Sequence, residues 1–138
     1  MEKHPLRIAF ETLDIDLFDD AVSEDVVFYT PILTHAVAGR DFVKRVFLTG
    51  ISGFGPPQVT DEFTNGAGRR IITWDSTIQG NSLQAALLAV DGPDGKVSEI
   101  RVYMRPLPVV SLFRDYMYPH FSGDLPAEYW EAVVETPA

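Results

Sequence analysis

A chain of 138 residues without cysteine excludes disulfides and thiolate chemistry, and it is long enough to bury a hydrophobic core as one domain. The net charge of −9, with lysines and arginines scattered along the chain, argues against nucleic-acid binding, because phosphate recognition needs a clustered cationic surface. The sequence has no signal-peptide pattern and no apolar run near the roughly 18 residues of a membrane span, so we expect a soluble cytoplasmic protein.

The first forty residues predict short helices followed by a strand. Apolar residues at helical spacing, with a proline suited to a first turn, predict a helix from Pro5 to about Leu13. A second short helix is expected over residues 16–22. Residues 26–29 are typical of a strand, and residues 31–39 then form a loop that holds His35.

The middle of the chain predicts one helix and an antiparallel meander. Apolar side chains at helical spacing predict a helix over residues 42–48, which the glycine-rich residues 50–57 end. Four strands follow, at residues 58–64, 69–79, 82–91 and 96–105, and the connections between them carry turn residues suited to hairpins. This order predicts an α+β domain with helices packed on one side of a sheet.

Residues 109–138 form an extension rich in large apolar side chains. These are Phe113, Tyr116, Met117, Tyr118, Phe121, Tyr129 and Trp130. So many aromatic rings are not expected in water. We expect them to pack across the opening of the domain, residues 1–108, or against a second subunit.

Two strands alternate between apolar and polar side chains. Ile72, Trp74 and Ile78 alternate with polar residues, and so do Ile100, Val102 and Met104, so each strand has one face suited to an apolar interior. The pattern indicates a curved sheet wrapped around an apolar space. The opposite faces carry Tyr29, Asp75, Arg101, Tyr103 and Arg105, where Asp75 could pair with either arginine across strands or across a dimer interface.

The order of a helix, "SEDVVFYTP", "GRDFVKRVF", a meander and "DGKVSEIRVYMRPLP" resembles the SnoaL-like branch of the nuclear transport factor 2-like (NTF2-like) superfamily, over residues 5–108. The resemblance implies a cystatin-like cone, in which a strongly bent, mostly antiparallel sheet is closed by the N-terminal helices around an apolar pocket. It also implies a homodimer through the outer sheet face. Relatives include steroid isomerases, polyketide cyclases, epoxide hydrolases and non-catalytic binding modules, so the fold leaves the activity open.

The active sites of these relatives do not carry over to this chain. The resemblance places the general-base aspartate of the steroid isomerases at Thr30, whose hydroxyl cannot act as a base near neutral pH. Their hydrogen-bond-donating aspartate falls on Ala86, or on Leu87 with a one-residue slip. Their oxyanion tyrosine falls on the first half of the first helix, which contains none. The epoxide hydrolases need an arginine between two aspartates, and the meander of this chain has no such arrangement. The cyclases use polar pocket residues on the late strands, where the inward positions of residues 97–104 in this chain are apolar.

Alternation and the resemblance together predict which residues face the cone. They are Phe28, Thr30, Phe42, Ile72, Trp74, Ser76, Gln84, Ala86, Leu88, Ile100, Val102 and Met104, with Val26, Phe10, Phe18 and Val46 adding to the wall and His35 at the mouth. An apolar cavity with a few polar groups is typical of a small-molecule site. The alternative is that these residues fill a core and that His35 is a surface histidine. The three histidines lack metal-ligand spacing, and we expect neither a metal nor a cofactor.

The sequence therefore predicts a protein that binds a small apolar molecule, and leaves open whether it is an enzyme. A catalytic alternative is an isomerase, cyclase or hydrolase acting on a polyketide-, steroid- or terpenoid-like substrate, with Thr30 and His35 as the candidate catalytic residues. A further alternative is a dimeric protein-interaction module based on the aromatic extension.

Overall fold

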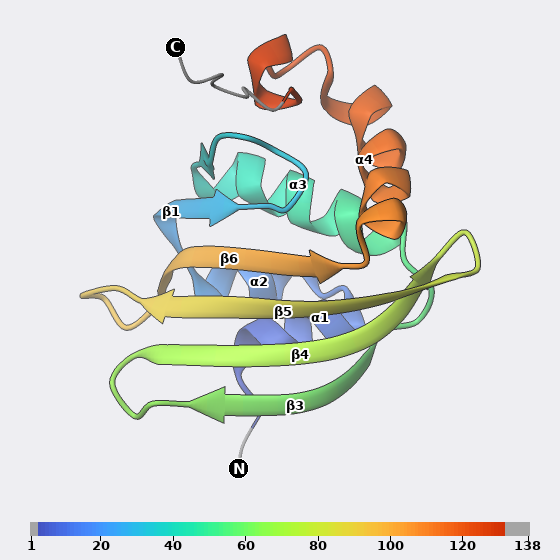
Figure 1. The fold of residues 1–138 in the computed structure, drawn as a ribbon. Helices are drawn as coiled ribbons and strands as arrows, with labels where there is room; N and C mark the ends of the chain where they lie inside the picture. The colour runs from blue at the N-terminus through green and yellow to red at the C-terminus, as the bar shows by residue number, and fades with distance from the viewer. Residues whose placement is uncertain (1–2, 132–138) are drawn as a thin grey trace, which may run out of the picture.

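The computed structural model describes residues 3–131 (Figure 1). Its elements are α1 (Pro5–Thr12), α2 (Ile15–Ala21), β1 (Val22–Tyr29), β2 (Val37–Ala38), α3 (Arg40–Ser52), β3 (Gln58–Thr64), β4 (Arg69–Ile78), β5 (Asn81–Asp91), β6 (Val97–Arg105), α4 (Leu107–Phe121) and the 3-10 helix η1 (Ala127–Tyr129). The order confirms the predicted α+β class. Within the described residues, no helix has the length and apolar character needed to cross a membrane.

The strands form one six-stranded sheet in the order β2-β1-β6-β5-β4-β3. Neighbouring strands are antiparallel except β1 and β6, which run parallel. Figure 1 shows the sheet curving in front of α1, α2 and α3, with α4 standing across one end. The helices therefore lie on one face of the sheet and leave the other face open.

Local sequence signals explain the N-terminal helices. Nδ1 of His4 accepts a hydrogen bond from the backbone N–H of Leu6 at 3.1 Å, which caps α1 ahead of Pro5. The Asp14 carboxylate caps α2 by accepting from the N–H groups of Asp16 and Leu17. These caps satisfy donors that the first turn of a helix leaves unpaired.

Several predicted boundaries differ from the structure. β1 begins at Val22 rather than at residue 26, because the Ser23 hydroxyl donates to the Val97 carbonyl at 3.0 Å and holds this segment against β6. Val22 thus belongs to the strand and not to the preceding helix. α3 runs from Arg40 to Ser52 and continues through Gly50, and the loop at 31–39 contains the short strand β2.

The inward face of β5 was predicted wrongly by one residue. Cross-strand partners share a face, and Trp74 lies opposite Ala85, which lies opposite Met104. The buried positions of β5 are Leu83, Ala85, Leu87 and Ala89, whereas Gln84 is exposed and Ala86 and Leu88 lie on the outer face. β5 is almost continuously apolar, so alternation could not fix its register. A one-residue error moves every side chain to the other face.

Phe47 of α3 lies at the centre of the core. Its ring centroid is 5.2 Å from that of Phe18 and 6.2 Å from those of Phe10 and Phe28. All four rings are buried, and burying a side chain of this size contributes about 1.5–3 kcal/mol. This cluster joins α1, α2, α3 and β1 into one core.

α4 packs closely against the end of α3. A Cβ atom added at Gly50 would lie 3.2 Å from the Phe113 ring, and one added at Gly53 would lie 2.5 Å from the Tyr116 ring. Phe121 packs edge-on against Phe42, with ring centroids 5.9 Å apart. The glycines therefore permit an approach that larger residues would block.

The segment after α4 folds back onto the same chain. The backbone N–H of Thr34 donates to the Tyr129 carbonyl at 2.8 Å, and Arg114 donates to the Trp130 carbonyl. Phe113, Phe121 and Trp130 of the extension are thus buried within the same chain, whereas Tyr118 is 48% exposed. The expected boundary between 108 and 109 falls in the first turn of α4, and residues 132–138 lie outside the described residues.

Candidate functional site: an apolar cavity under the sheet

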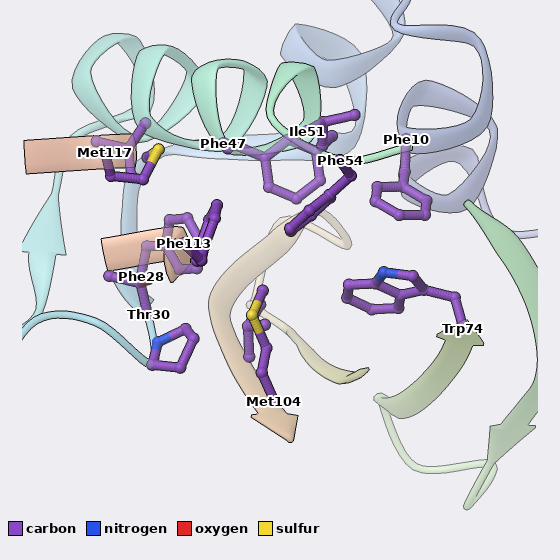
Figure 2. A pocket seen from close by; sticks show the side chains of 14 residues that line it. Phe10, Phe28, Thr30, Phe47, Ile51, Phe54, Trp74, Met104, Phe113 and Met117 are labelled. Carbon is purple, nitrogen blue, oxygen red and sulfur yellow. The ribbon is translucent and has the colours of Figure 1, made fainter. Parts of the chain in front are cut away.

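A partly open apolar cavity of about 30 Å³ lies between the sheet, α3 and α4 (Figure 2). It is lined by Phe10, Phe28, Thr30, Pro31, Val46, Phe47, Gly50, Ile51, Phe54, Trp74, Val102, Met104, Phe113 and Met117. These residues come from α1, β1, α3, β4, β6 and α4 and from the segments that follow β1 and α3. We call this space the inner cavity.

The lining of the inner cavity has no side chain that titrates between pH 2 and pH 12. Its polar side-chain groups are the hydroxyl of Thr30 and the indole N–H of Trp74. General acid–base catalysis needs a group whose proton can move near the working pH. The inner cavity can therefore bind and orient a molecule, but its own side chains supply neither a general acid nor a general base.

The cavity is smaller than most ligand sites. About 30 Å³ accommodates roughly one water molecule, whereas small-molecule pockets commonly measure about 300–1,000 Å³. The rings of Phe54 and Phe113, 5.0 Å apart, line the cavity together with the flexible side chains of Met104 and Met117. A ligand must displace some of these four side chains to enter.

The structure brings together only some of the predicted site residues. Phe28, Thr30, Trp74, Val102 and Met104 line the inner cavity, together with Phe10 and Val46 from the helices. Ile72, Ser76 and Ile100 are buried on the predicted face but do not line it. The Ser76 hydroxyl instead donates to the Gly55 carbonyl at 2.8 Å.

The remaining predicted residues lie elsewhere. The inward placement of Gln84, Ala86 and Leu88 is wrong, since these residues face outward from β5. Of the two positions aligned with the second aspartate of the steroid isomerases, Ala86 and Leu87, Leu87 faces inward. Phe42 packs on Phe121, outside the cavity. His35 is exposed, with its ring 5.0 Å from that of Tyr129, so it does not reach the cavity.

Sequence reasoning missed the side of the cavity built by α4 and the end of α3. Phe47, Gly50, Ile51, Phe54, Phe113 and Met117 line it together with Pro31. The glycines at 50 and 53 were interpreted as the end of a helix. Glycines on a helix also indicate that another element packs closely against it. The aromatic extension, residues 109–138, was the candidate for that element.

A second hollow lies on the opposite face of β4, β5 and β6. This outer groove has a volume of about 410 Å³ and is lined by Thr60, Thr73, Trp74, Asp75, Gln84, Ala85, Ala86, Tyr103, Met104 and Arg105. Arg105 donates to the Gln84 side chain, and Arg101 contacts Glu99 and the Tyr29 ring. Among residues 3–131, Asp75 forms no ion pair with either arginine, so the expected pairing is wrong within this chain.

A charged network ties α1 to the edge of the sheet. Glu62 of β3, with its side chain 5% exposed, accepts from Arg7 at 3.3 Å and from Arg70 at 2.5 Å. Burial alone would raise the pKa of Glu62, but the hydrogen bonds from Arg70 and Arg7 outweigh it and hold the pKa below its ordinary value. The Arg7 hydrogen bond also lowers the pKa of Glu11. This network is structural and distant from the inner cavity.

Within the part of the chain that the structure describes, no group of three or more His, Cys, Asp or Glu side chains could hold a metal ion.

The comparisons with known proteins identify a fold. No protein-family model and no curated protein matches the chain. A crystal structure of an uncharacterised bacterial protein with a cystatin-like fold, from Silicibacter pomeroyi DSS-3, superposes with a TM-score of 0.79 at 22% identity, covering 88% of each chain. A steroid delta-isomerase from Pseudomonas aeruginosa superposes with a TM-score of 0.78 at 15% identity, covering 89% of this chain and 95% of that one.

A third similar structure is a protein from Jannaschia sp. CCS1 assigned as a SnoaL-like polyketide cyclase. Its TM-score is 0.65 at 15% identity, and the match covers 80% of this chain and 89% of that one. At these identities the likeness concerns the fold alone. The expected NTF2-like, SnoaL-like fold is thereby confirmed, and the inner cavity occupies the space between its bent sheet and its helices.

Proposed function

We propose that this NTF2-like chain binds a small apolar molecule in the inner cavity without acid–base catalysis by the side chains that line it. One observation carries the proposal: an apolar pocket is lined by residues from six elements and two connecting segments, and none of their side chains ionises near neutral pH. Apolar walls with few polar groups favour an apolar ligand, because its transfer from water supplies the binding free energy.

Binding would couple to movement of α4. Phe113 and Met117 project from α4 into the cavity, where they meet Phe54 from the segment after α3 (Figure 2). When a ligand enters, these side chains take new rotamers or α4 shifts away from α3. The bound form is therefore expected to contain a larger cavity than the closed form.

A thermal-shift screen against steroids, fatty acids, terpenoids and aromatic polyketides tests the proposal. A ligand at 100 times its dissociation constant stabilises a fold by about 2.7 kcal/mol, a readily measured shift. Val102→Phe would place a ring in the cavity and should abolish the shift, while Tyr103→Phe changes the opposite face of β6 and should leave it intact. A screen without hits, or a shift that survives Val102→Phe in a folded protein, would contradict the proposal.

The catalytic alternative makes a different prediction. Thr30 is the one candidate catalytic residue at the cavity, and His35 lies on the surface beside Tyr129. In a binding protein, Thr30→Ala and His35→Ala keep their affinity for an apolar ligand to within a few-fold. In an isomerase, cyclase or hydrolase, the same changes would abolish turnover of a steroid- or polyketide-like substrate.

We also propose a homodimer through the outer face of the sheet. Phe63 and Ile71 are opposite each other on β3 and β4 with 59% and 42% of their surfaces exposed, and Ile71 is opposite Leu88. Tyr103, with 56% of its surface exposed, lies on the same outer face opposite Ala86. Contiguous exposed apolar side chains favour a protein contact.

Analytical ultracentrifugation tests the dimer. Ile71→Lys should convert the dimer to a monomer and leave ligand binding intact, because the substitution is on the face opposite the inner cavity. Leu13→Lys, at an exposed apolar position after α1, is the matched control and should remain dimeric. A wild-type chain that sediments as a monomer at tens of micromolar would contradict the proposal.

A further inference from the structure

Trp74 presents a buried hydrogen-bond donor to the inner cavity. Within residues 3–131, the buried side-chain nitrogens that find no acceptor are Arg40 Nε, Trp74 Nε1 and Trp130 Nε1. Of these three residues, only Trp74 lines the inner cavity, and its surface is 3% exposed. Figure 2 shows the nitrogen-bearing edge of the indole turned toward the side on which Phe10, Ile51 and Phe54 lie.

The walls around this donor supply no acceptor. The Phe10 ring lies 4.8 Å from the indole, and the other neighbouring wall residues in Figure 2 are also apolar. A buried N–H group without an acceptor costs about 1–3 kcal/mol. An indole nitrogen can donate but cannot accept, so only an occupant with a lone pair can relieve this cost.

We infer that the ligand of the inner cavity is a neutral, apolar molecule with a carbonyl or ether oxygen that accepts a hydrogen bond from Trp74 Nε1. The inference rests on the function proposed above and specifies the chemical class of its ligand. Carboxylates and phosphates do not fit, because no cationic side chain lines the cavity and a buried unpaired charge is costly. The Thr30 hydroxyl both donates and accepts, so it accommodates a second polar group of either kind.

An isosteric pair of probes tests the inference directly. Cyclohexanone and methylenecyclohexane differ in having an oxygen or a methylene group at the same position. In ¹H–¹⁵N NMR spectra the chain has two indole signals, from Trp74 and Trp130, which Trp74→Phe assigns. Cyclohexanone should move the Trp74 signal in a saturable way and leave Trp130 unmoved, and methylenecyclohexane should produce a much smaller shift at Trp74.

A double comparison separates the hydrogen bond from the change in shape. Trp74→Phe should weaken cyclohexanone binding about tenfold, which corresponds to about 1.4 kcal/mol, and should leave methylenecyclohexane binding within about twofold. If both probes bind and Trp74→Phe affects them equally, a trapped water satisfies the indole, and the inference is wrong while the proposed function stands. If neither probe binds, the proposed function fails together with the inference.

Discussion

The inner cavity and the outer groove are on opposite faces of β4 and β6, and Trp74 and Met104 border both. Alternate residues separate them: Trp74 faces inward and Asp75 outward, and Val102 faces inward and Tyr103 outward. The inner cavity has about 30 Å³ and no ionisable lining, while the outer groove has about 410 Å³ and contains charged side chains. The larger hollow is therefore not the better site for an apolar molecule.

This difference shows that volume and burial give separate information about a site. In the inner cavity an apolar molecule loses its contact with water, which is the source of its binding free energy. In the outer groove water competes for every hydrogen bond, and charge pairs contribute little. We expect the inner cavity to bind an apolar ligand after it opens, and the outer face to bind a second protein surface.

The largest effect is expected from removing the ring that anchors α4 in the inner cavity. Phe113 is buried between Gly50 and Phe54, so Phe113→Ala should lower the free energy of unfolding by about 3–5 kcal/mol. Urea unfolding measures the loss. Leu107→Ala, at a 77% exposed position of the same helix, should change it by less than about 0.5 kcal/mol. A loss below about 1 kcal/mol for Phe113→Ala would show that α4 is not anchored there.

A smaller loss of stability, which depends on pH, is expected when the charged network around Glu62 is broken. Glu62→Gln should cost about 1–3 kcal/mol at pH 7, because a buried carboxylate that receives charged hydrogen bonds is neutralised. The pKa of Glu62 is lowered by folding, so this stabilisation is present above the unfolded-state pKa near 4.5 and is lost as the pH falls through the lower folded-state value.

Urea unfolding between pH 7 and pH 3 checks this sign. The stability of the wild type should fall more steeply below pH 4.5 than that of Glu62→Gln. Asp61→Asn, an exposed neighbour on the same strand, is the control and should follow the wild-type curve. If the stability of wild type and of Glu62→Gln falls in parallel with pH, the Glu62 carboxylate does not stabilise the fold through its ion pairs.

Substituting a glycine where α4 closely approaches α3 should lower stability by an intermediate amount. Gly53→Ala places a Cβ atom 2.5 Å from the Tyr116 ring, which must move and weaken its 3.0 Å hydrogen bond to Ser52. We expect a loss of about 1–2 kcal/mol in thermal unfolding. Gly123→Ala, where no atom lies within 4 Å, should be neutral or slightly stabilising, and equal effects of the two changes would contradict the packing described.

The smallest effect is expected at the cap of α1. Burial lowers the pKa of His4, and the nearby Arg70 adds to this, so the neutral form that caps α1 is favoured by folding. The stabilisation is present above the unfolded-state pKa of about 6.5 and is lost as the pH falls through the lower folded-state value. His4→Asn keeps a cap that does not titrate, so stability should decline less between pH 7 and pH 5 than in the wild type. His35→Asn should retain the wild-type decline.

The sequence predicted those parts of the fold in which one local signal dominated. The hairpins between β3 and β6 were located within about one residue, because turn residues separate segments of β-forming sequence. The inward faces of β4 and β6 followed from alternation at Trp74 and Val102. β5 lacks alternation, and only its pairing with Trp74 and Met104 fixes its inward face.

The candidate site was predicted only in part, because half of its wall depends on long-range packing. Phe28, Thr30 and Trp74 could be predicted from strand patterns. The positions of Phe54 and Phe113 depend on how α4 meets the end of α3, and helical periodicity does not specify a partner. The unpaired indole nitrogen depends on the whole lining, so no local pattern could reveal it.

The most direct test of the central claim compares the two hollows in one sample. Methyl groups of Met117, in the inner cavity, and of Ala86, in the outer groove, are observed by ¹H–¹³C NMR while cyclohexanone is added. We predict that the Met117 signal moves and saturates while the Ala86 signal stays unchanged. A shift at Ala86 without one at Met117 would show that the apolar molecule binds outside the cone and would contradict the account.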